Sequence, residues 1–393
     1  MELREYQKQA IDKILWAKNA KLEGNDLIVL PTGAGKSIVI ANLVHQLNEP
    51  VLILQPSKEI LEQNYKKLLN YINAFEIGIY SASMNEKVVR NFTLATIQSI
   101  YTKPEEFNHF KLVIIDECHL VNPKNLGGMF SSFLEAIGNP KVIGLTATPY
   151  RMDLSYKHTD YGLYAYTTTK LINRMKGFFW QRLLSNINIQ DLINQDFLCP
   201  LEYIDRSVIE HADIPLNKSA SEFDLDGYEK MLTNKQEKIL EAINYGQSIS
   251  KSVLVFCSSV KQATLFCDLV EGSAIVTAKT PAKERQDIIN KFKDLEIKTV
   301  FNVGVLTTGF DHPSLDCIVL LRPTRSIGLY YQMLGRGVRK AEGKISCKII
   351  DMTSTVKSLG KVESIKLEKQ DKWELMSETG SWHNRELYSF KIK

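Results

Sequence analysis

The stretch VLPTGAGKS, residues 29–37, stands where a short apolar run gives way to a helical pattern. The run before it, DLIVL (residues 26–30), is too short for a helix and too continuous for a strand exposed on one face. After it, apolar residues recur at helical spacing: Ile38, Ala41, Leu43, Val44 and Leu47. A strand, a glycine-containing loop and a helix in this order predict a parallel sheet covered by helices.

Similar apolar runs recur along the chain in two series. The first series continues with VLIL, LVII and VIGL at residues 51–54, 112–115 and 142–145. The second contains VLVF, AIVT, KTVF and CIVLL at residues 253–256, 274–277, 298–301 and 317–321. Helical patterns separate these runs, so the sequence predicts an α/β fold with two parallel-sheet domains.

The predicted domain boundaries follow from these two series. We expect a first domain at residues 1–200, with an irregular segment from about residue 150, and a linker at residues 201–234. The second domain is expected at residues 235–352. Residues 353–393 alternate apolar and polar side chains around Trp373, Trp382 and Tyr388, which favours a small appendage rich in β structure.

Composition narrows the class of protein. The 393 residues include 24% charged side chains, and the net charge of +4 permits a polyanionic partner without requiring one. No apolar run is long enough to span a bilayer, so we expect no membrane partner. The six cysteines are scattered, with no Cys-x-x-Cys pair, which argues against a zinc site or a disulfide framework. A reducing cytoplasm is the expected location.

The loop at residues 29–37 has the chemistry of a phosphate-binding loop. Glycines 33 and 35 let backbone N–H groups turn toward phosphate oxygens, Lys36 reaches the β- and γ-phosphates, and the Ser37 hydroxyl can ligate Mg2+. Leu30 replaces the first glycine of the usual G-x-x-x-x-G-K-[ST] pattern. An ordinary glycine-rich turn is the alternative, which Lys36 and Ser37 disfavour. The predicted nucleotide-binding loop comprises Pro31, Thr32, Gly33, Ala34, Gly35, Lys36 and Ser37.

A second cluster, VIIDECHL (residues 113–120), ends a predicted buried strand on polar and reactive side chains. An ATPase with such a loop needs an acidic residue to hold Mg2+ and another group to handle the attacking water. Asp116 suits the metal, and Glu117 suits the water as a general base. His119 is expected to pair with a polar group, and Cys118 to serve packing. The alternative is a solvated turn after a strand.

Together these motifs resemble those of superfamily-2 helicases and translocases of the DExH type, in the family's order and spacing from Leu3 to about Met352. The resemblance implies two RecA-like domains in tandem. LREYQKQAI (residues 3–11) resembles the family's adenine-sensing segment, in which Gln7 would read the adenine edge with help from Arg4. By itself that segment is an ordinary amphipathic helix start.

Other segments resemble motifs that track a nucleic-acid strand, namely LQPSKEIL (residues 54–61) and ATIQS (residues 95–99). LTATP (residues 145–149) resembles the coupling motif, whose threonines would link residues 116–119 to the nucleic-acid contacts. Taken singly, each segment is only a strand end or a turn. The resemblance implies contacts to a nucleic-acid backbone from Pro56, Ser57, Thr96, Gln98, Ser258, Thr307 and Thr308.

The second domain carries two further motifs of the family. NVGVLTTGFDHP (residues 302–313) resembles the motif that places Gly309 and Asp311 near the ribose. YQMLGRGVR (residues 331–339) resembles the arginine-finger motif, with Gln332, Arg336 and Arg339 as catalytic residues. We expect the two arginines, three residues apart, to share one helical face and to act on the γ-phosphate across the domain cleft.

Within this superfamily the sequence resembles the bacterial RadD-type repair helicases, on NVGVLTTGFD, LLRPTRSIGLYYQMLGRGVR and DFLCPLEY (residues 196–203). Those proteins have a cysteine-rich, zinc-ribbon-like tail, whereas this chain has no cysteine after Cys347. Functions that belong to that tail are therefore not carried over. A phage or mobile-element relative reduced to the motor fits this pattern.

The resemblance predicts an ATP- and Mg2+-dependent motor on single-stranded or branched DNA, acting in repair, recombination or replication. Two alternatives stay open. One is an RNA helicase, against which His119 and LTATP argue. The other is an ATP-gated clamp on nucleic acid with little unwinding activity, against which an intact Glu117 argues. No feature of the sequence identifies a protein partner.

The segment from Tyr150 to Arg182 mixes basic and aromatic residues, a combination that holds phosphates and stacks on bases. We predict that Lys170, Arg174 and Lys176 line the DNA path, because acidic residues are scarce there. For the apolar residues, the favoured alternative is one packed face of a helix, formed by Leu171, Met175, Phe178 and Phe179.

Overall fold

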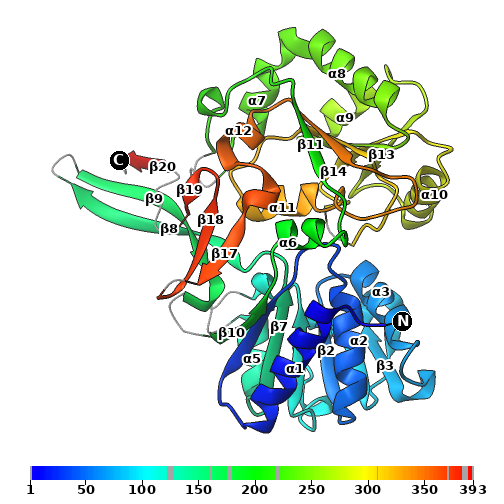
Figure 1. The fold of residues 1–393 in the computed structure, drawn as a ribbon, viewed down its shortest axis with the longest axis vertical. Coiled ribbons are helices and arrows are strands. Elements are labelled where there is room, and N and C mark those ends of the chain that lie inside the picture. The colour runs from blue at the N-terminus through cyan, green and yellow to red at the C-terminus, as the bar shows by residue number, and fades with distance from the viewer. Residues whose placement is uncertain are drawn as a thin grey trace. The chain divides into compact units, whose positions relative to one another are not determined.

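The computed structural model describes residues 2–121, 128–159, 162–174, 179–217, 222–307, 309–369, 371–382 and 388–391. The chain divides into two compact units (Figure 1). The first comprises residues 1–151 and 170–187, and the second comprises residues 152–169 and 188–393. No helix in the described part of the chain is long and apolar enough to cross a membrane.

The first unit contains a sheet of eight strands in the order β10-β1-β7-β6-β2-β5-β3-β4. Neighbouring strands in its described part pair in parallel, except that β3 and β4 are antiparallel. Its strands are β1 (Asn25–Val29), β2 (Val51–Gln55), β3 (Ile77–Ser81), β4 (Glu86–Lys87), β5 (Phe92–Thr96), β6 (Leu112–Asp116), β7 (Lys141–Thr146) and β10 (Trp180–Asn186). Its α-helices are α1 (Glu5–Asn19), α2 (Lys36–Leu47), α3 (Lys58–Leu68), α4 (Ile97–Ile100) and α5 (Met129–Ala136).

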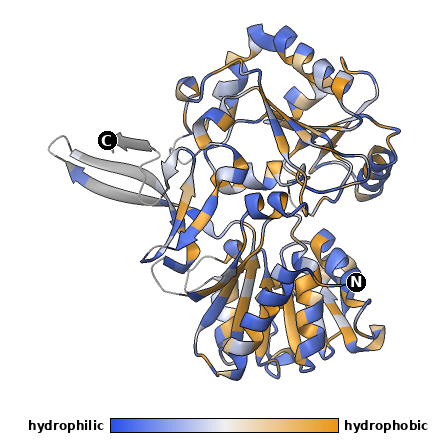
Figure 2. Cartoon of the chain, viewed as in Figure 1, coloured by the Kyte–Doolittle hydropathy of each residue, from blue (hydrophilic) through white to orange (hydrophobic). Residues whose placement is uncertain are grey.

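Helix and strand contacts explain why the apolar runs of this unit are continuous. Every residue of β2, β5 and β6 is buried, as expected of strands covered on both faces. Helices α1, α2 and α3 pack side by side, and α3 also packs on β2 and β5. The strands accordingly stand out as hydrophobic, while the helices carry hydrophilic residues as well (Figure 2).

The second unit contains a fully parallel sheet of six strands in the order β11-β16-β15-β12-β14-β13. Its strands are β11 (Leu201–Asp205), β12 (Val253–Cys257), β13 (Ser273–Thr277), β14 (Thr299–Val303), β15 (Cys317–Leu321) and β16 (Cys347–Asp351). Its helices are α6 (Ile189–Asn194), α7 (Leu225–Met231), α8 (Gln236–Ile249), α9 (Val260–Cys267), α10 (Ala282–Lys293), α11 (Ile327–Leu334) and α12 (Thr355–Leu359). The predicted pair of parallel-sheet α/β domains is therefore confirmed.

The predicted appendage is also present as a small antiparallel sheet. It consists of β17 (Lys366–Lys369), β18 (Trp373–Ser377) and β19 (Gly380–Ser381). Trp382, which follows β19, is buried, and its indole N–H donates to the Ser377 hydroxyl at 2.8 Å. Leu367 of β17 and Leu375 of β18 are buried, whereas both residues of β19 are exposed.

The segment from residue 150 is more regular than predicted. It forms β8 (Tyr150–Thr159) and β9 (Gly162–Leu171), which share a three-stranded sheet with β20 (Tyr388–Lys391). The helical alternative for residues 171–179 is wrong in its described part, because Ile172–Arg174 form a single 3-10 turn and Phe179 lies outside any helix. Met175, Lys176 and Phe178 lie outside the described residues. Trp180 is instead buried in β10, which pairs in parallel with β1 and so joins the first sheet.

Candidate active site

The phosphate-binding loop follows β1 and leads directly into α2. Gly33 and Gly35 have φ angles of 84° and 81°, in the left-handed region that glycine adopts without strain. A Cβ at Gly35 would lie 2.7 Å from Nε2 of Gln7, so the loop leaves no room for a side chain there. Lys36 and Ser37 occupy the first turn of α2, where backbone N–H groups have no partner within the helix. This cradle fits phosphate oxygens.

Side chains of the N-terminal helix α1 hold the phosphate-binding loop through hydrogen bonds. The Tyr6 hydroxyl and the Gln7 amide both donate to the carbonyl of Ala34, at 2.8 and 2.9 Å. The Oε1 atom of Gln7 accepts from the backbone N–H of Arg4 at 3.0 Å, and the Arg4 guanidinium donates to Tyr6. The structure therefore places Gln7 against the phosphate loop, and its adenine-reading role stays a prediction. Tyr6 was not singled out by any sequence pattern, because an aromatic near a helix start has no distinctive spacing.

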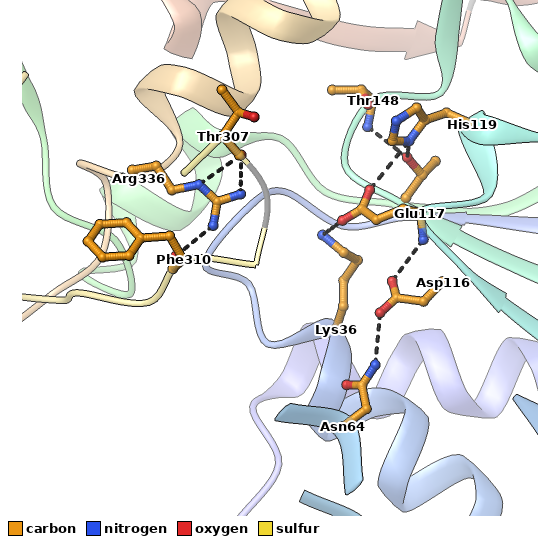
Figure 3. A network of polar contacts seen from close by, with 10 residues as sticks. Lys36, Asn64, Asp116, Glu117, His119, Thr148, Thr307, Phe310 and Arg336 are labelled. Carbon is orange, nitrogen blue, oxygen red and sulfur yellow. Dashed lines mark hydrogen bonds and ion pairs between the residues drawn. The ribbon is translucent and has the colours of Figure 1, made fainter. Parts of the chain in front are cut away.

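The acid pair lies at the end of β6, next to the loop (Figure 3). Lys36 Nζ lies 3.3 Å from Oε1 of Glu117, and Oε2 of Glu117 lies 3.4 Å from Nδ1 of His119. His119 Nδ1 is in turn 2.9 Å from the Thr146 hydroxyl at the end of β7. The contact expected between the LTATP threonines and residues 116–119 is thus made by Thr146.

The backbone at Glu117 has a conformation that residues other than glycine rarely adopt. Its φ of 49° lies in the left-handed region, which is sterically unfavourable for a residue with a Cβ. The residue nevertheless begins the turn that carries Cys118 and His119. Arg151 closes this turn by donating to the carbonyl of His119 at 3.0 Å. Such strain concentrates at functional sites, and here it lies at the predicted general base.

The two carboxyl groups have opposite electrostatic environments. Burial, reinforced by the negative charge of Glu117, raises the pKa of Asp116 to about 6. Burial also acts to raise the pKa of Glu117, but the positive charge of Lys36 and the hydrogen bond from His119 outweigh it and hold the pKa below its usual value. Cys118 is fully buried, and burial raises the pKa of its thiol well above the ordinary value, which agrees with the predicted packing role.

The predicted magnesium ligands are Asp116 at the end of β6 and Ser37 at the start of α2. Asp116 and Ser37 supply a carboxylate and a hydroxyl, which are hard oxygen ligands of the kind that Mg2+ prefers. Among the described residues no group of three or more His, Cys, Asp or Glu side chains forms a metal cage. Mg2+ is usually bound by one or two protein oxygens together with substrate phosphates and water.

Asn64 on α3 contacts the predicted metal carboxylate, and sequence reasoning missed it. Its Nδ2 atom donates to Oδ2 of Asp116 at 3.0 Å, while the backbone N–H of Glu117 donates to Oδ1 at 2.9 Å. These two bonds fix the plane of the carboxylate (Figure 3). Asn64 and Asp116 are 52 residues apart in the chain, so no local sequence pattern predicts the contact.

The candidate nucleic-acid residues of the first unit lie at the ends of β2 and β5. Ser57 caps α3 and accepts from the backbone N–H of Ile60, and Pro56 precedes it. The Thr96 hydroxyl lies 2.8 Å from that of Ser99, and Gln98 is exposed in α4. Because the carboxyl ends of parallel strands meet at one edge of a sheet, these residues share that edge with the phosphate loop and the acid pair.

In the second unit, two arginines converge on one loop, and Figure 3 shows Arg336 with its partners Thr307 and Phe310. Arg336 is 6% exposed; its Nε and Nη2 atoms donate to the carbonyl of Thr307 at 3.1 and 2.6 Å, and its Nη1 to that of Phe310 at 2.8 Å. Arg339 also donates to the Phe310 carbonyl and pairs with Asp311, both at 2.8 Å. Gly309, between these carbonyls, has a φ of 69°. The arginines therefore hold the predicted ribose-binding loop in shape.

The predicted helical face for these arginines is wrong. Helix α11 carries Gln332 but ends at Leu334, so Arg336 and Arg339 lie in the turn after it. Gly335 caps the helix, and Gly337 packs where a Cβ would lie 2.6 Å from the Cys347 sulfur. Glycine disfavours helix continuation, and this close approach to β16 uses its lack of a side chain.

Other predicted nucleic-acid residues occupy varied positions. The Ser258 hydroxyl is buried and lies 3.0 and 3.1 Å from carboxylate and amide oxygens of Glu229 and Gln262, so it is committed to contacts within the second unit. Lys170 and Arg174 lie at the end of β9 and in the following 3-10 turn, both partly exposed. Thr308 and Lys176 lie outside the described residues.

Comparisons with known proteins agree with this arrangement of motifs. Residues 1–151 match the family described as type III restriction enzyme, res subunit, and residues 234–341 match the helicase conserved C-terminal domain. The putative ATP-dependent helicase IRC3 of Saccharomyces cerevisiae is 30% identical over 380 residues, which cover 89% of this chain and 51% of the yeast protein. The DNA 3'-5' translocase XPB2 of Sulfurisphaera tokodaii is 27% identical over 367 residues, covering 87% and 80%. This chain thus spans about half the length of the yeast relative.

Solved structures share the fold. A fragment of a putative HsdR subunit of a type I restriction enzyme from Vibrio vulnificus has a TM-score of 0.66 and 22% identity, covering 91% of this chain and 65% of that one. Saccharomyces cerevisiae Dbp5 bound to RNA and ADP BeF3 has a TM-score of 0.57 and 14% identity, covering 91% and 87%. The particular resemblance to RadD-type proteins stays a prediction. With two parallel-sheet domains, the phosphate loop, the acid pair and both family matches in place, the chain carries the two domains named in these matches and is similar to superfamily-2 helicases.

Proposed function

We propose that this protein is an ATP-dependent motor on DNA, which couples ATP hydrolysis to translocation or to remodelling of single-stranded or branched DNA. The observation that carries the proposal is the chain of contacts Lys36–Glu117–His119–Thr146, which joins the phosphate loop to the end of β7 through the acid pair. DNA as the substrate is supported by the similarity to a protein named as a DNA 3'-5' translocase. A role in repair, recombination or replication is part of the proposal.

The same contacts suggest how ATP engages the site. Lys36 pairs with Glu117 at 3.3 Å and thereby lowers the basicity of the carboxylate. When Lys36 turns to a phosphate, Glu117 loses that positive neighbour and becomes a better proton acceptor for the attacking water. His119 and Thr146 keep the carboxylate oriented during this exchange. Substrate binding would thus prepare the general base.

The metal has a defined place in the proposal. Asp116 and Ser37 would hold Mg2+, which supplies charge neutralisation on the β- and γ-phosphate oxygens. Asn64 and the backbone N–H of Glu117 keep the Asp116 carboxylate in position. Arg339, Arg336 and Gln332 of the second unit are proposed to serve the γ-phosphate, with Gly309 and Asp311 near the ribose.

A pair of variants tests the enzymatic part. Lys36→Ala is expected to lose nucleotide binding or hydrolysis, because it removes the ammonium that pairs with phosphate. Glu117→Gln is expected to bind Mg2+ and ATP while turnover falls by about 100-fold or more, since an amide cannot accept the proton of the water. The measurements are fluorescent-nucleotide binding and ATPase rates, and near-normal turnover by Glu117→Gln would contradict the assignment.

Substrate class is tested by stimulation. ATPase activity measured with single-stranded DNA, forked DNA and RNA of matched length is expected to rise most with DNA. Strand displacement on the forked DNA then separates a helicase from a translocase. Stimulation by RNA alone would favour the RNA helicase alternative, and nucleotide-dependent binding without movement would favour the clamp.

A further inference from the structure

The end of β2 carries a buried amide that nothing in the proposed mechanism uses. Gln55 is 2% exposed, and among the described residues neither its Nε2 nor its Oε1 atom has a hydrogen-bond partner. A buried polar group without a partner is destabilising, so native proteins usually retain one for a reason. Gln55 immediately precedes Pro56 and Ser57, the predicted nucleic-acid contacts.

A second unpartnered atom lies close by on α3. Asn64 is 1% exposed, and while its Nδ2 atom donates to Asp116, its Oδ1 atom has no partner among the described residues. Gln55 thus offers an unused donor and Asn64 an unused acceptor. The two groups are chemically complementary.

The strand register brings both amides to the same place. Leu54 pairs with Ile115, so Gln55 lies beside Asp116 on neighbouring parallel strands, which are about 4.8 Å apart. On its other side Gln55 pairs with Thr96 of β5. Residues in register on parallel strands point to the same face, and the Asn64 bond shows that Asp116 faces α3. Gln55 therefore lies between the metal carboxylate and the predicted nucleic-acid residues.

Helix α3 connects these two sets of residues mechanically. Its N-cap is Ser57, a predicted DNA contact, and Asn64 lies about two turns further along the same rigid helix. A small displacement of α3 when Ser57 engages a DNA backbone would move Asn64 relative to Asp116 and to the sheet. Such a displacement would change the distance between the unpartnered atoms of Asn64 on α3 and Gln55 on β2.

We propose that Gln55 and Asn64 are positioning residues that couple DNA binding to the metal-binding carboxylate. In the DNA-bound state the Gln55 amide donates to Oδ1 of Asn64, and Asn64 keeps its bond to Asp116. The hydrogen bond formed only in that state favours the carboxylate position that binds Mg2+ and nucleotide. This inference rests on the proposed function, because it assumes that one chain binds both DNA and Mg2+–ATP.

The test measures coupling by binding, without turnover. The affinity for a fluorescent single-stranded DNA is measured by anisotropy with and without Mg2+ and a non-hydrolysable ATP analogue, and the ratio of the two affinities is the coupling factor. Factors of about 5 to 150 are typical for linked sites. In Gln55→Leu and in Asn64→Leu we expect the factor to fall to within about twofold of unity. DNA affinity without nucleotide should change little in Gln55→Leu.

Thermal unfolding separates this role from a structural one. Gln55→Leu removes a polar group that has no partner, so its Tm is expected to equal or exceed that of the wild type. A variant that is as stable as the wild type and yet uncoupled cannot be explained by damage to the fold. Gln55→Met, which keeps the length of the side chain, serves if the leucine variant does not fold.

Two further variants complete the design. Asn42→Leu is the matched control, since Asn42 is a buried asparagine of the same unit whose amide donates to the Ile38 carbonyl of its own helix. This variant should keep the wild-type coupling factor. The double variant Gln55→Leu with Asn64→Leu should be no less coupled than either single variant, because the two residues share one bond.

The outcomes distinguish the inference from the proposed function. Two results would refute the proposed function and the inference with it. One is a wild-type protein that binds no DNA, and the other is a DNA affinity that is the same with and without nucleotide. A wild-type protein with clear coupling that both single variants retain refutes the inference alone.

Discussion

Replacing Arg336 by alanine is expected to loosen the loop at residues 304–310 as well as to affect chemistry. The guanidinium donates twice to the Thr307 carbonyl and once to the Phe310 carbonyl, and it is 6% exposed. Phe310 keeps a bond from Arg339 after the substitution, whereas both guanidinium bonds to the Thr307 carbonyl are lost. Hydrogen bonds from a charged donor are worth about 1.5–3 kcal/mol each. Two such bonds to Thr307 are lost, so the expected loss of unfolding free energy is about 3–6 kcal/mol.

Arg339→Ala is the control variant for the stability loss expected of Arg336→Ala. The Phe310 carbonyl retains Arg336, and the lost partner Asp311 has a side chain that is 54% exposed. An ion pair with so exposed a partner contributes at most about 1 kcal/mol. Arg339→Ala should therefore lose turnover, by on the order of 10³-fold if it serves as the transition-state arginine, with little loss of stability.

Urea unfolding and hydrogen exchange together measure the difference. A loss of about 3–6 kcal/mol lowers the midpoint by at least about 1 M urea, since the dependence on urea is about 1–3 kcal/mol per molar. Hydrogen exchange followed by mass spectrometry should show faster exchange in peptides covering residues 304–310 for Arg336→Ala only. Equal midpoints and equal exchange in the two variants would refute the view that Arg336 holds the loop.

Two further predictions concern DNA binding and acid stability. Replacing Lys170, Arg174 and Lys176 together by alanine should weaken DNA binding and flatten the dependence of log affinity on log salt. The affinity for ATP should be retained. An unchanged slope would show that these residues have a structural role instead. Burial lowers the pKa of His312 to about 4, so the unfolded state binds the proton first and stability falls as the pH drops from about 6.5 to 4. His312→Phe, which keeps an aromatic ring beside Phe292 and Phe310, should reduce that loss of stability in urea midpoints measured at pH 7 and pH 4.5, and equal losses would contradict the assignment.

The sequence by itself determined the features that depend on local pattern. The continuous apolar runs specified strands buried on both faces, and VLPTGAGKS specified a loop whose glycines adopt positive φ. The motif spacing also specified the order of the functional segments along two parallel sheets. Parallel topology then brings strand ends to one edge whatever the details of packing, and for this reason the phosphate loop and the acid pair lie together.

Only the tertiary structure decided which distant side chains meet. Asn64 reaches Asp116 because α3 packs over the sheet, and Gln55 lies beside Asp116 because of strand register. Arg336 leaves the predicted helix because Gly335 caps it and Gly337 approaches Cys347 too closely for a side chain. β10 joins the first sheet beside β1 although its residues lie far away in the chain. Periodicity records the face of an element that is buried, but it carries no information on the partner, which depends on packing between segments far apart in sequence.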